Sequence, residues 1–338
     1  MALDSMAPDG RDAPTADGRL TRRMLPVGDG HEIYVETVGN PNGLPAVYLH
    51  GGPGSGCQPD HRRLFDPARC HAVLFDQRGA GLSRPRGERA ANTTQHLIAD
   101  MEAIRALFGF ERWIVVGGSW GATLALAYAE QYPQRVSALV LRATFLGTRA
   151  ELDWAFLGGL RRFHPALFDD FLGVLPPQER AAPLEAYWRR ILDPDPAVHT
   201  PAARAWYDTE RALSELRPVR ARINRDALHD NVRPLPATPF MEAHYFRNQC
   251  FLAPDQLLTG AHRLRGIPGI IIQGRYDMLC PAATAQALVM AWPDAELRIV
   301  EGAGHSLHDP GIADAVTAAI SDIAALVPRT GRLTTASD

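Results

Sequence analysis

Trp113-Ile-Val-Val-Gly-Gly-Ser-Trp-Gly-Ala-Thr-Leu-Ala-Leu-Ala-Tyr128 is the stretch that decides the fold. A short apolar run ends in two glycines and a serine, and an Ala- and Leu-rich segment of helical composition follows one further glycine. This pattern predicts a strand, a sharp turn and a helix, with the turn matching the G-x-S-x-G nucleophile elbow. Small residues two positions either side of Ser119 let the strand and helix hold that serine in a strained conformation. Ser119 is therefore predicted to be a nucleophile.

Apolar runs and helical stretches alternate on both sides of this elbow. We predict strands at 31–38, 46–50, 72–75, 137–141, 267–273 and 295–300, and helices at 94–108, 282–292 and 312–326. Asn92 or Thr93 is expected to cap the first of these helices. Strands that are apolar throughout and separated by helices indicate a parallel sheet covered on both faces. The predicted fold class is therefore α/β, with a mostly parallel sheet.

The alternation is interrupted between about 145 and 263. This part of the chain is rich in Trp, Arg and Pro, with amphipathic helical stretches and no clear strand. Because the strand pattern resumes afterwards, we expect an inserted helical cap over the carboxyl edge of the sheet, with an independent domain as the alternative. The predicted division is a flexible leader (1–24), an α/β core (25–144 and 264–328), a helical cap (145–263) and a flexible tail (329–338).

Composition and charge exclude several kinds of partner. The 338 residues are 46% apolar and 22% charged, with a net charge of −3 and no basic run, so nucleic acid is not an expected partner. We find neither a signal-peptide core nor an apolar run long enough to span a membrane. The four cysteines lack metal-ligand spacing and are expected to be reduced thiols in a cytoplasmic protein. The expected partner is a peptide or small-molecule substrate; the oligomeric state stays open.

A nucleophilic serine needs a base, and that base needs an orienting group. In hydrolases with this elbow the chain order is Ser, then Asp or Glu, then His. Asp277 follows one apolar strand and His305 follows the last one, so both are predicted to face Ser119. The competing carboxylates, Asp294 and Asp309, lie before the last strand or beyond it. The predicted catalytic set is Ser119, Asp277 and His305.

The tetrahedral intermediate of acyl transfer needs backbone N–H donors. One is predicted to be the amide of Trp120, the residue after the nucleophile, and the other an amide of the early loop His50-Gly-Gly-Pro-Gly. Gly52 is the preferred second donor and Gly51 the alternative. Gly51 is otherwise expected to line the substrate site.

Five motifs together resemble one family, and the resemblance covers roughly residues 25–325. The motifs are His50-Gly-Gly-Pro-Gly, Asp76-Gln-Arg-Gly-Ala-Gly-Leu-Ser, Gly117-Gly-Ser-Trp-Gly-Ala-Thr-Leu-Ala-Leu-Ala-Tyr, Gly274-Arg-Tyr-Asp and Gly302-Ala-Gly-His-Ser. In combination they resemble the proline iminopeptidases, serine peptidases of the α/β-hydrolase fold. The resemblance implies release of an N-terminal proline from peptides without a metal or another cofactor.

The resemblance also implies two carboxylates around the free amino group of the substrate. Ala205-Trp-Tyr-Asp-Thr-Glu210 and Met241-Glu-Ala-His-Tyr-Phe246 are similar to the family segments that carry them, which points to Glu210 and Glu242. A buried cationic imino group needs such partners, although glutamates on helices are usually solvated. The chain departs from the family at Thr209, where a second Trp is expected, and over 219–239.

The leading hypothesis is a serine exopeptidase that releases N-terminal proline or a similar small residue. A related serine hydrolase acting on esters, amides or lactones is the second hypothesis, because the cap diverges from the family. A binding protein that keeps the pocket without the chemistry is the third.

Overall fold

An eight-stranded sheet forms the centre of the computed structural model, which describes residues 20–230 and 234–327. Its strand order is β1-β2-β4-β3-β5-β6-β7-β8. The pairs β1–β2 and β2–β4 are antiparallel, and all the other pairs are parallel. The strands are β1 (Thr21–Gly28), β2 (His31–Gly39), β3 (Leu44–Leu49), β4 (Cys70–Phe75), β5 (Trp113–Ser119), β6 (Val136–Thr144), β7 (Gly269–Gly274) and β8 (Ala295–Val300).

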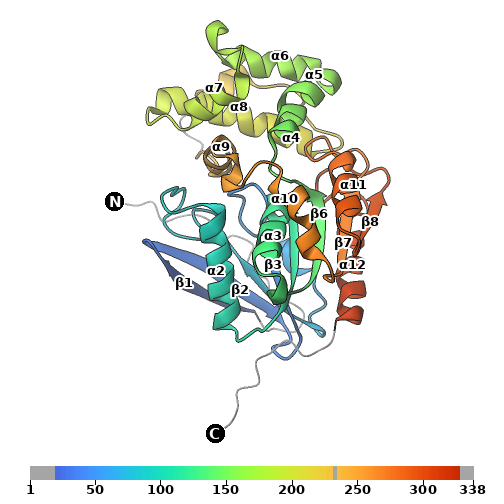
Figure 1. The fold of residues 1–338 in the computed structure, drawn as a ribbon. Coiled ribbons are helices and arrows are strands. Elements are labelled where there is room, and N and C mark those ends of the chain that lie inside the picture. The colour runs from blue at the N-terminus through green and yellow to red at the C-terminus, as the bar shows by residue number, and fades with distance from the viewer. Residues whose placement is uncertain (1–19, 231–233, 328–338) are drawn as a thin grey trace.

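Helices cover both faces of the sheet (Figure 1). On β5, Val115 belongs to one apolar cluster, whereas Ile114 and Val116 belong to the cluster on the opposite face, as the two-residue period of a strand requires. The first cluster includes side chains of α2, α3 and α11, and the second includes side chains of α12. The core helices are α1 (Pro59–Arg62), α2 (Thr94–Leu107), α3 (Trp120–Gln131), α10 (Gln256–Thr259), α11 (Ala282–Ala291) and α12 (Ile312–Leu326).

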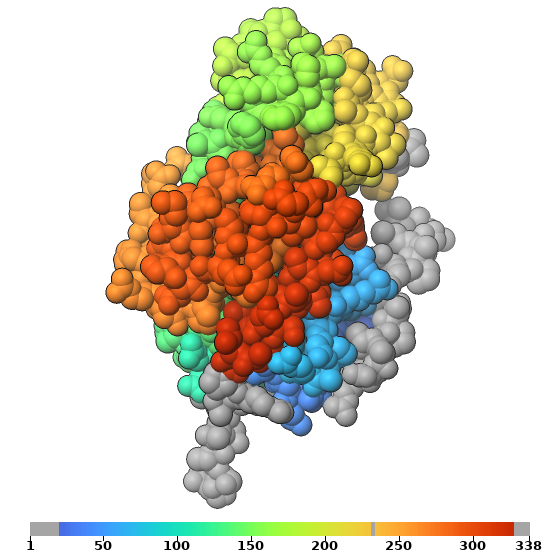
Figure 2. Space-filling model, turned by 90° about the vertical axis from the view of Figure 1, so that its right-hand side faces the viewer, coloured from blue at the N-terminus to red at the C-terminus, as the bar shows by residue number. Residues whose placement is uncertain are grey.

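A second group of helices lies between β6 and β7 in the chain and sits on one end of the core (Figures 1 and 2). It consists of α4 (Arg149–Asp153), α5 (Leu160–Phe163), α6 (Pro165–Val174), α7 (Pro183–Ile191), α8 (Pro196–Ser214) and α9 (Thr238–Arg247), with a π-helical turn at Trp154–Gly159. Within the described ranges, no helix of the chain has the length and apolar composition needed to cross a membrane.

The predicted α/β class is confirmed, and the predicted elements match the observed ones closely. The helix expected at 312–326 is α12, and the helix expected at 94–108 is α2, which ends at Leu107. Thr93 caps α2, since its side chain accepts a hydrogen bond from the His96 amide. The division into core and cap stays a prediction. The divergent stretch 219–239 contains one short helical turn, Arg225–Ala227, before α9 begins; residues 231–233 lie outside the described residues.

The carboxyl-terminal boundary predicted for the flexible leader, residue 24, is wrong. β1 begins at Thr21 and pairs antiparallel with β2 along its whole length, and the Thr21 and Thr37 hydroxyls hydrogen-bond at 2.6 Å. Most of β1 is exposed, so it lacks the apolar alternation that identifies a strand in a sequence. Pairing with β2 holds it in place instead. Residues 1–19 of the leader and 328–338, which include the predicted tail, lie outside the described residues.

A buried ion pair fastens the loop after β4 to the rest of the core. The Arg78 guanidinium donates two hydrogen bonds of 2.8 Å to the Asp100 carboxylate on α2, and both side chains are almost fully buried. The same guanidinium donates to the carbonyls of Val27 on β1 and Ala91. The pair therefore joins β1, α2 and the loop that begins at Asp76.

Asp100→Ala is expected to destabilise the protein strongly, because it removes the buried carboxylate that pairs with Arg78 and leaves only the longer, 3.3 Å pair with the exposed Asp29. The expected loss is about 3–5 kcal/mol in the free energy of unfolding, measured by urea denaturation. Asp322→Ala is the control, since Asp322 pairs with Arg298 at an exposed site and surface pairs contribute little. Similar losses in the two variants would contradict the assignment of a structural role to the buried pair.

Candidate active site

Ser119 occupies a sharp turn between β5 and α3. Its backbone has φ 57° and ψ −124°, a left-handed region that non-glycine residues rarely adopt. The glycines around it leave no space for a side chain: a Cβ on Gly117 would lie 2.3 Å from the Gly121 carbonyl oxygen. A Cβ on Gly121 would lie 2.1 Å from the carbonyl oxygen of Leu49 on β3. Close packing of α3 against the sheet therefore holds the serine in its strained conformation.

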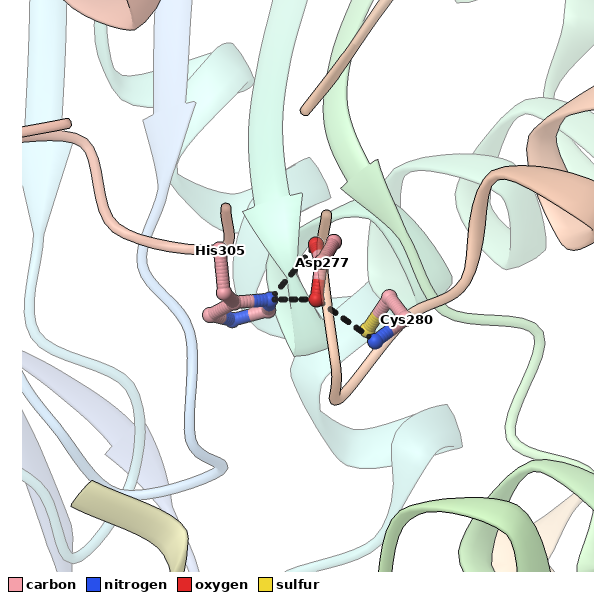
Figure 3. Close-up of side chains that lie close together, drawn as sticks. All are labelled: Asp277, Cys280 and His305. Atoms are coloured by element: carbon pink, nitrogen blue, oxygen red, sulfur yellow. Dashed lines mark hydrogen bonds and ion pairs between the residues drawn. The ribbon is translucent and has the colours of Figure 1, made fainter. Parts of the chain in front are cut away.

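Asp277 and His305 come from the loops that follow β7 and β8, and the fold brings them together. The His305 Nδ1 lies 3.0 Å from Oδ1 and 2.9 Å from Oδ2 of Asp277. The Asp277 carboxylate also accepts hydrogen bonds from the amides of Leu279 and Cys280 and from the Gln273 side chain. These donors fix the carboxylate, which leaves Nδ1 as the protonated nitrogen of the imidazole. The other ring nitrogen points away from Asp277 (Figure 3).

The Ser119 hydroxyl lies beside these residues but forms no hydrogen bond with His305 among the described residues. It contacts the Cys280 thiol, whose sulfur lies within 4.8 Å of both the His305 ring and the Asp277 carboxylate. Catalytic hydrogen bonds are often long before a substrate binds, so this separation is compatible with proton transfer from serine to histidine.

Asp277, Cys280 and His305 are close enough together to be considered as metal ligands (Figure 3). Their chemistry fits a metal poorly, because both carboxylate oxygens already accept hydrogen bonds from the protein. Burial raises the pKa of the Cys280 thiol well above its usual range, and the Asp277 charge raises it further, which disfavours the thiolate that a metal requires.

The loop after β3 lies against the nucleophile. A Cβ on Gly51 would be 3.4 Å from the Ser119 Cβ and 3.2 Å from the Gly118 carbonyl oxygen. Gly52 lines the pocket that contains Ser119 and has φ +108°, a conformation that favours glycine. Trp120 supplies the first amide of α3, and amides of a first helical turn have no acceptor within the helix. Backbone donors on both sides of Ser119 can therefore face an oxyanion.

The pocket over Ser119 is small, about 30 Å³. Aromatic side chains from the core and the cap wall it, and Glu210 of α8 lies at its boundary. Its lining residues are Gly52, Ser119, Phe145, Glu151, Leu152, Ala155, Phe156, Glu210, Phe246, Leu279 and Cys280. A substrate at Ser119 would therefore meet an apolar wall and the carboxyl groups of Glu151 and Glu210. The Glu151 carboxylate already accepts hydrogen bonds from the amides of Leu146 and Thr148, whereas Glu210 lies next to Glu242.

Glu242 of α9 lies behind Glu210 and is fully buried. Its Oε2 accepts a 2.5 Å hydrogen bond from the Trp206 indole, whereas no N–H or O–H donor of the described chain reaches its Oε1. Glu210 lies within hydrogen-bonding reach of Glu242, so the two carboxyl groups can share a proton. Glu242 is fully buried and Glu210 is half-buried, so these two neighbouring carboxyl groups lie where a negative charge is poorly solvated.

The environment of this pair disfavours its negative charge. Burial raises the pKa of the Glu242 carboxyl well above its usual range, and the nearby Glu210 charge raises it further. Burial also raises the pKa of Glu210, although the hydrogen bond with Glu242 and the charge of His305 oppose this shift. A bound cation would reverse these effects by stabilising both carboxylates.

Aromatic packing positions the pair. The Trp206 ring, which binds Glu242, stacks on Phe156 at a centroid distance of 4.1 Å. Thr209, at the position where the family pattern has a second Trp, is fully buried and its hydroxyl donates to the Ala205 carbonyl within α8. It faces its own helix and adds no aromatic wall.

Sequence reasoning did not find every residue of the pocket. Phe145 and Phe156 look like ordinary core residues in the sequence, because only the packing of the cap brings them over Ser119. Cys280 had a weak signal, since it follows Asp277 by three residues in the same loop. His50 and Gln77 connect the loops around the site. Both belong to the motifs that carry the family resemblance, but the sequence alone does not indicate what either residue does.

Comparison with known proteins agrees with this geometry. The model of the alpha/beta hydrolase fold family matches residues 45–311, and the chain belongs to that family. A proline iminopeptidase from Xylella fastidiosa is 46% identical over 297 residues, which cover 88% of this chain and 94% of the relative. A proline iminopeptidase from Arabidopsis thaliana is 42% identical over 305 residues, which cover 90% of this chain and 80% of the relative. The resemblance found in the sequence is thus confirmed, and within the α/β hydrolases the chain belongs to the proline iminopeptidase family.

Solved structures show the same fold at lower identity. The crystal structure of a proline iminopeptidase from Mycobacterium smegmatis has a TM-score of 0.55 and 21% identity, and the match covers 90% of this chain and 99% of that one. At this identity the likeness supports the fold alone.

Gly121→Ala is expected to destabilise the protein, whereas a Gly→Ala substitution within a helix usually stabilises it. Replacing glycine by alanine normally stabilises a helix by roughly 0.5–1 kcal/mol. Here the new Cβ would overlap the Leu49 carbonyl, so we expect a loss of about 1–3 kcal/mol in the free energy of unfolding. Gly158→Ala is the matched control, since its Cβ would meet only the Asp153 carbonyl oxygen at 3.7 Å. Equal stability changes in the two variants, measured by urea denaturation, would contradict the packing argument.

Proposed function

We propose that this protein is a serine exopeptidase that releases N-terminal proline, or a similar small residue, from peptides. The observation that carries the proposal is the pair of carboxyl groups formed by the fully buried Glu242 and the half-buried Glu210, next to the pocket of Ser119. Such a pair costs stability in the free protein, and the positive charge of a substrate amino group would offset that cost. The names of the family relatives support the same activity.

The proposed mechanism is acyl transfer through Ser119. Its hydroxyl attacks the carbonyl carbon of the N-terminal residue while His305 takes the hydroxyl proton. His305 then gives this proton to the departing amine, the acyl-enzyme forms, and a water activated by His305 hydrolyses it. Asp277 orients the imidazole and stabilises its charged form. The amides of Gly52 and Trp120 are proposed to bind the oxyanion.

The carboxyl pair supplies the specificity in this proposal. The charged imino group of an N-terminal proline would contact Glu210 and Glu242, and the pyrrolidine ring would lie against Phe145, Phe156 and Phe246. A residue inside a peptide has no such charge, so binding it would leave the carboxyl groups buried without a cation. Exopeptidase action follows from this difference, and Gly51 is proposed to line the same site.

A cytoplasmic location is part of the proposal. The four cysteines, Cys57, Cys70, Cys250 and Cys280, are all buried and reduced, which suits a reducing compartment. The proposed partner is a peptide substrate.

The experiment that tests the function compares three substrates under steady-state conditions. Proline 4-nitroanilide is expected to be cleaved rapidly, its N-acetylated form slowly or not at all, and a simple aryl ester slowly. Ser119→Ala is expected to abolish turnover of all three, because it removes the nucleophile. Undiminished activity of Ser119→Ala would overturn the assignment of the nucleophile.

Substrate preference is a separate outcome of that experiment. Ester turnover without cleavage of the proline amide would retain the serine chemistry and overturn the exopeptidase proposal. Equal rates on the free and N-acetylated proline amides would show that no charged imino group is recognised.

Glu242→Gln is expected to stabilise the free protein and to impair substrate binding. A carboxyl group with a raised pKa contributes stability at low pH and loses it as the pH rises through that pKa. The gain in the free energy of unfolding should therefore be larger at pH 8 than at pH 5. KM for the free proline amide should rise about 10- to 100-fold, because one charged hydrogen bond to the imino group is lost.

The same argument predicts the pH dependence of the wild type. KM for the free-amine substrate should fall as the pH rises and the pair ionises, as long as the substrate amine remains charged. The exposed Glu111→Gln serves as the control for stability and KM. A pH-independent stability difference between Glu242→Gln and the wild type would contradict the buried-carboxyl argument.

A further inference from the structure

We infer that Gln77 is a positioning residue that holds the two halves of the oxyanion hole in a fixed relation. The inference rests on the proposed function, since it concerns the amides of Gly52 and Trp120. These donors belong to different parts of the fold, the loop after β3 and the first turn of α3. Gln77 belongs to neither part but contacts both.

Gln77 follows β4 and is almost fully buried. Its Oε1 accepts a 2.9 Å hydrogen bond from the Trp120 indole, and its Nε2 donates a 2.9 Å hydrogen bond to the His50 carbonyl. Its backbone amide donates to the His50 Nε2 at 3.0 Å. One residue therefore binds the side chain of Trp120 and both the backbone and the imidazole of His50.

The hydrogen bonds of His50 determine which of its nitrogens carries the proton. Because Nε2 accepts from the Gln77 amide, the proton of the neutral imidazole lies on Nδ1 and is donated to the Gly51 carbonyl at 2.9 Å. The opposite tautomer would satisfy only the contact from the Gly56 amide, at 3.2 Å. Burial lowers the pKa of His50, so the ring is held neutral.

This hydrogen bond to Gly51 fixes the direction of the Gly52 amide. The Gly51 carbonyl and the Gly52 N–H belong to one planar peptide group, and in a trans peptide they point in opposite directions. Fixing the carbonyl against the His50 imidazole therefore aims the Gly52 N–H away from His50. Gly51 adjoins Ser119, and Gly52 lines the pocket over it. The Gln77 network thus sets the orientation of one oxyanion donor while binding the residue that supplies the other.

Such a network matters for rate more than for binding. Oxyanion donors stabilise charge that develops only in the transition state, and they work because the protein holds them in place beforehand. A substrate in its ground state has no oxyanion, so its affinity does not depend on their exact direction. A positioning role therefore predicts a lower kcat with an unchanged KM.

The test is Gln77→Met, which has nearly the same volume but cannot form the side-chain hydrogen bonds. We expect kcat for proline 4-nitroanilide to fall about 10- to 100-fold, somewhat less than the effect of deleting an oxyanion donor, with KM changed less than about twofold. The affinity for pyrrolidine-2-boronic acid, which forms a tetrahedral adduct with the serine, should fall by a similar factor as kcat/KM. The affinity for L-prolinol, which has no carbonyl group, should stay unchanged.

Gln77→Glu tests whether Gln77 positions the oxyanion donors if Gln77→Met fails to fold. Its carboxyl group keeps an acceptor for the Trp120 indole but can donate to the His50 carbonyl only when it is protonated. The ratio of the variant kcat to the wild-type kcat should therefore rise as the pH falls. A merely structural role would not produce this recovery. Gln95→Met is the matched control on the exposed side of α2, and its kinetics should equal those of the wild type.

Three results would overturn the inference. They are a folded Gln77→Met variant with kcat within twofold of the wild type, equal losses of affinity for the boronic acid and for prolinol, and a pH-independent ratio for Gln77→Glu. The outcome is separable from that of the proposed function. A wild type that cleaves esters but not proline amides overturns the exopeptidase proposal, and the Gln77 variants can then be tested on the ester with phenylboronic acid as the analogue.

Discussion

The contact between α3 and the sheet is the constraint on which the rest of the structure depends. Helix and strand meet at Gly117 and Gly121 with no room for a Cβ, and this contact forces Ser119 into its left-handed conformation. Ser119 then lies at the carboxyl edge of β5, between the loops that follow β3, β7 and β8. In parallel sheets this edge is where loops from several strands converge. The proposed nucleophile, base and oxyanion donors can meet there because the close contact between Gly117 and Gly121 fixes the position of Ser119.

A second constraint joins the cap to this edge. Tyr245 of α9 packs on the Trp120 ring at a centroid distance of 4.6 Å, and its hydroxyl donates to the Asn92 side chain. Asn92 in turn binds the Arg78 carbonyl in the loop that contains Gln77. The helix that carries Glu242 is therefore fastened to the residue that follows the nucleophile. These contacts hold Glu242 in a fixed relation to Ser119, as the proposed recognition of a substrate amine next to the scissile bond requires.

Local patterns in the sequence predicted the elements whose stability comes from burial. The strands from β2 to β7 and helices such as α12 bury apolar side chains, and β8 buries its apolar side chains in part, so their positions could be predicted from the sequence. β1 was missed because backbone pairing with β2, rather than burial, holds it in place. For the site, Asp277 and His305 could be located from chain order and strand ends. Glu210 and Glu242 could be reached only by resemblance, because nothing in a helical sequence distinguishes a buried carboxylate from a solvated one. Phe145 and Phe156 depended on how the cap packs.

The two constraints together explain why an unfavourable charge pair can persist in this fold. Two carboxyl groups next to each other in an aromatic wall oppose folding, and their cost must be offset by packing elsewhere. The Trp206 ring, stacked on Phe156, contributes both apolar burial and one hydrogen bond to Glu242. A large hydrophobic cap therefore does more than cover the sheet, since it buries Glu242 completely and Glu210 in part. In the proposed function, this burial lets the pair discriminate between a charged imino group and a neutral amide, because in water either group would be solvated at little cost.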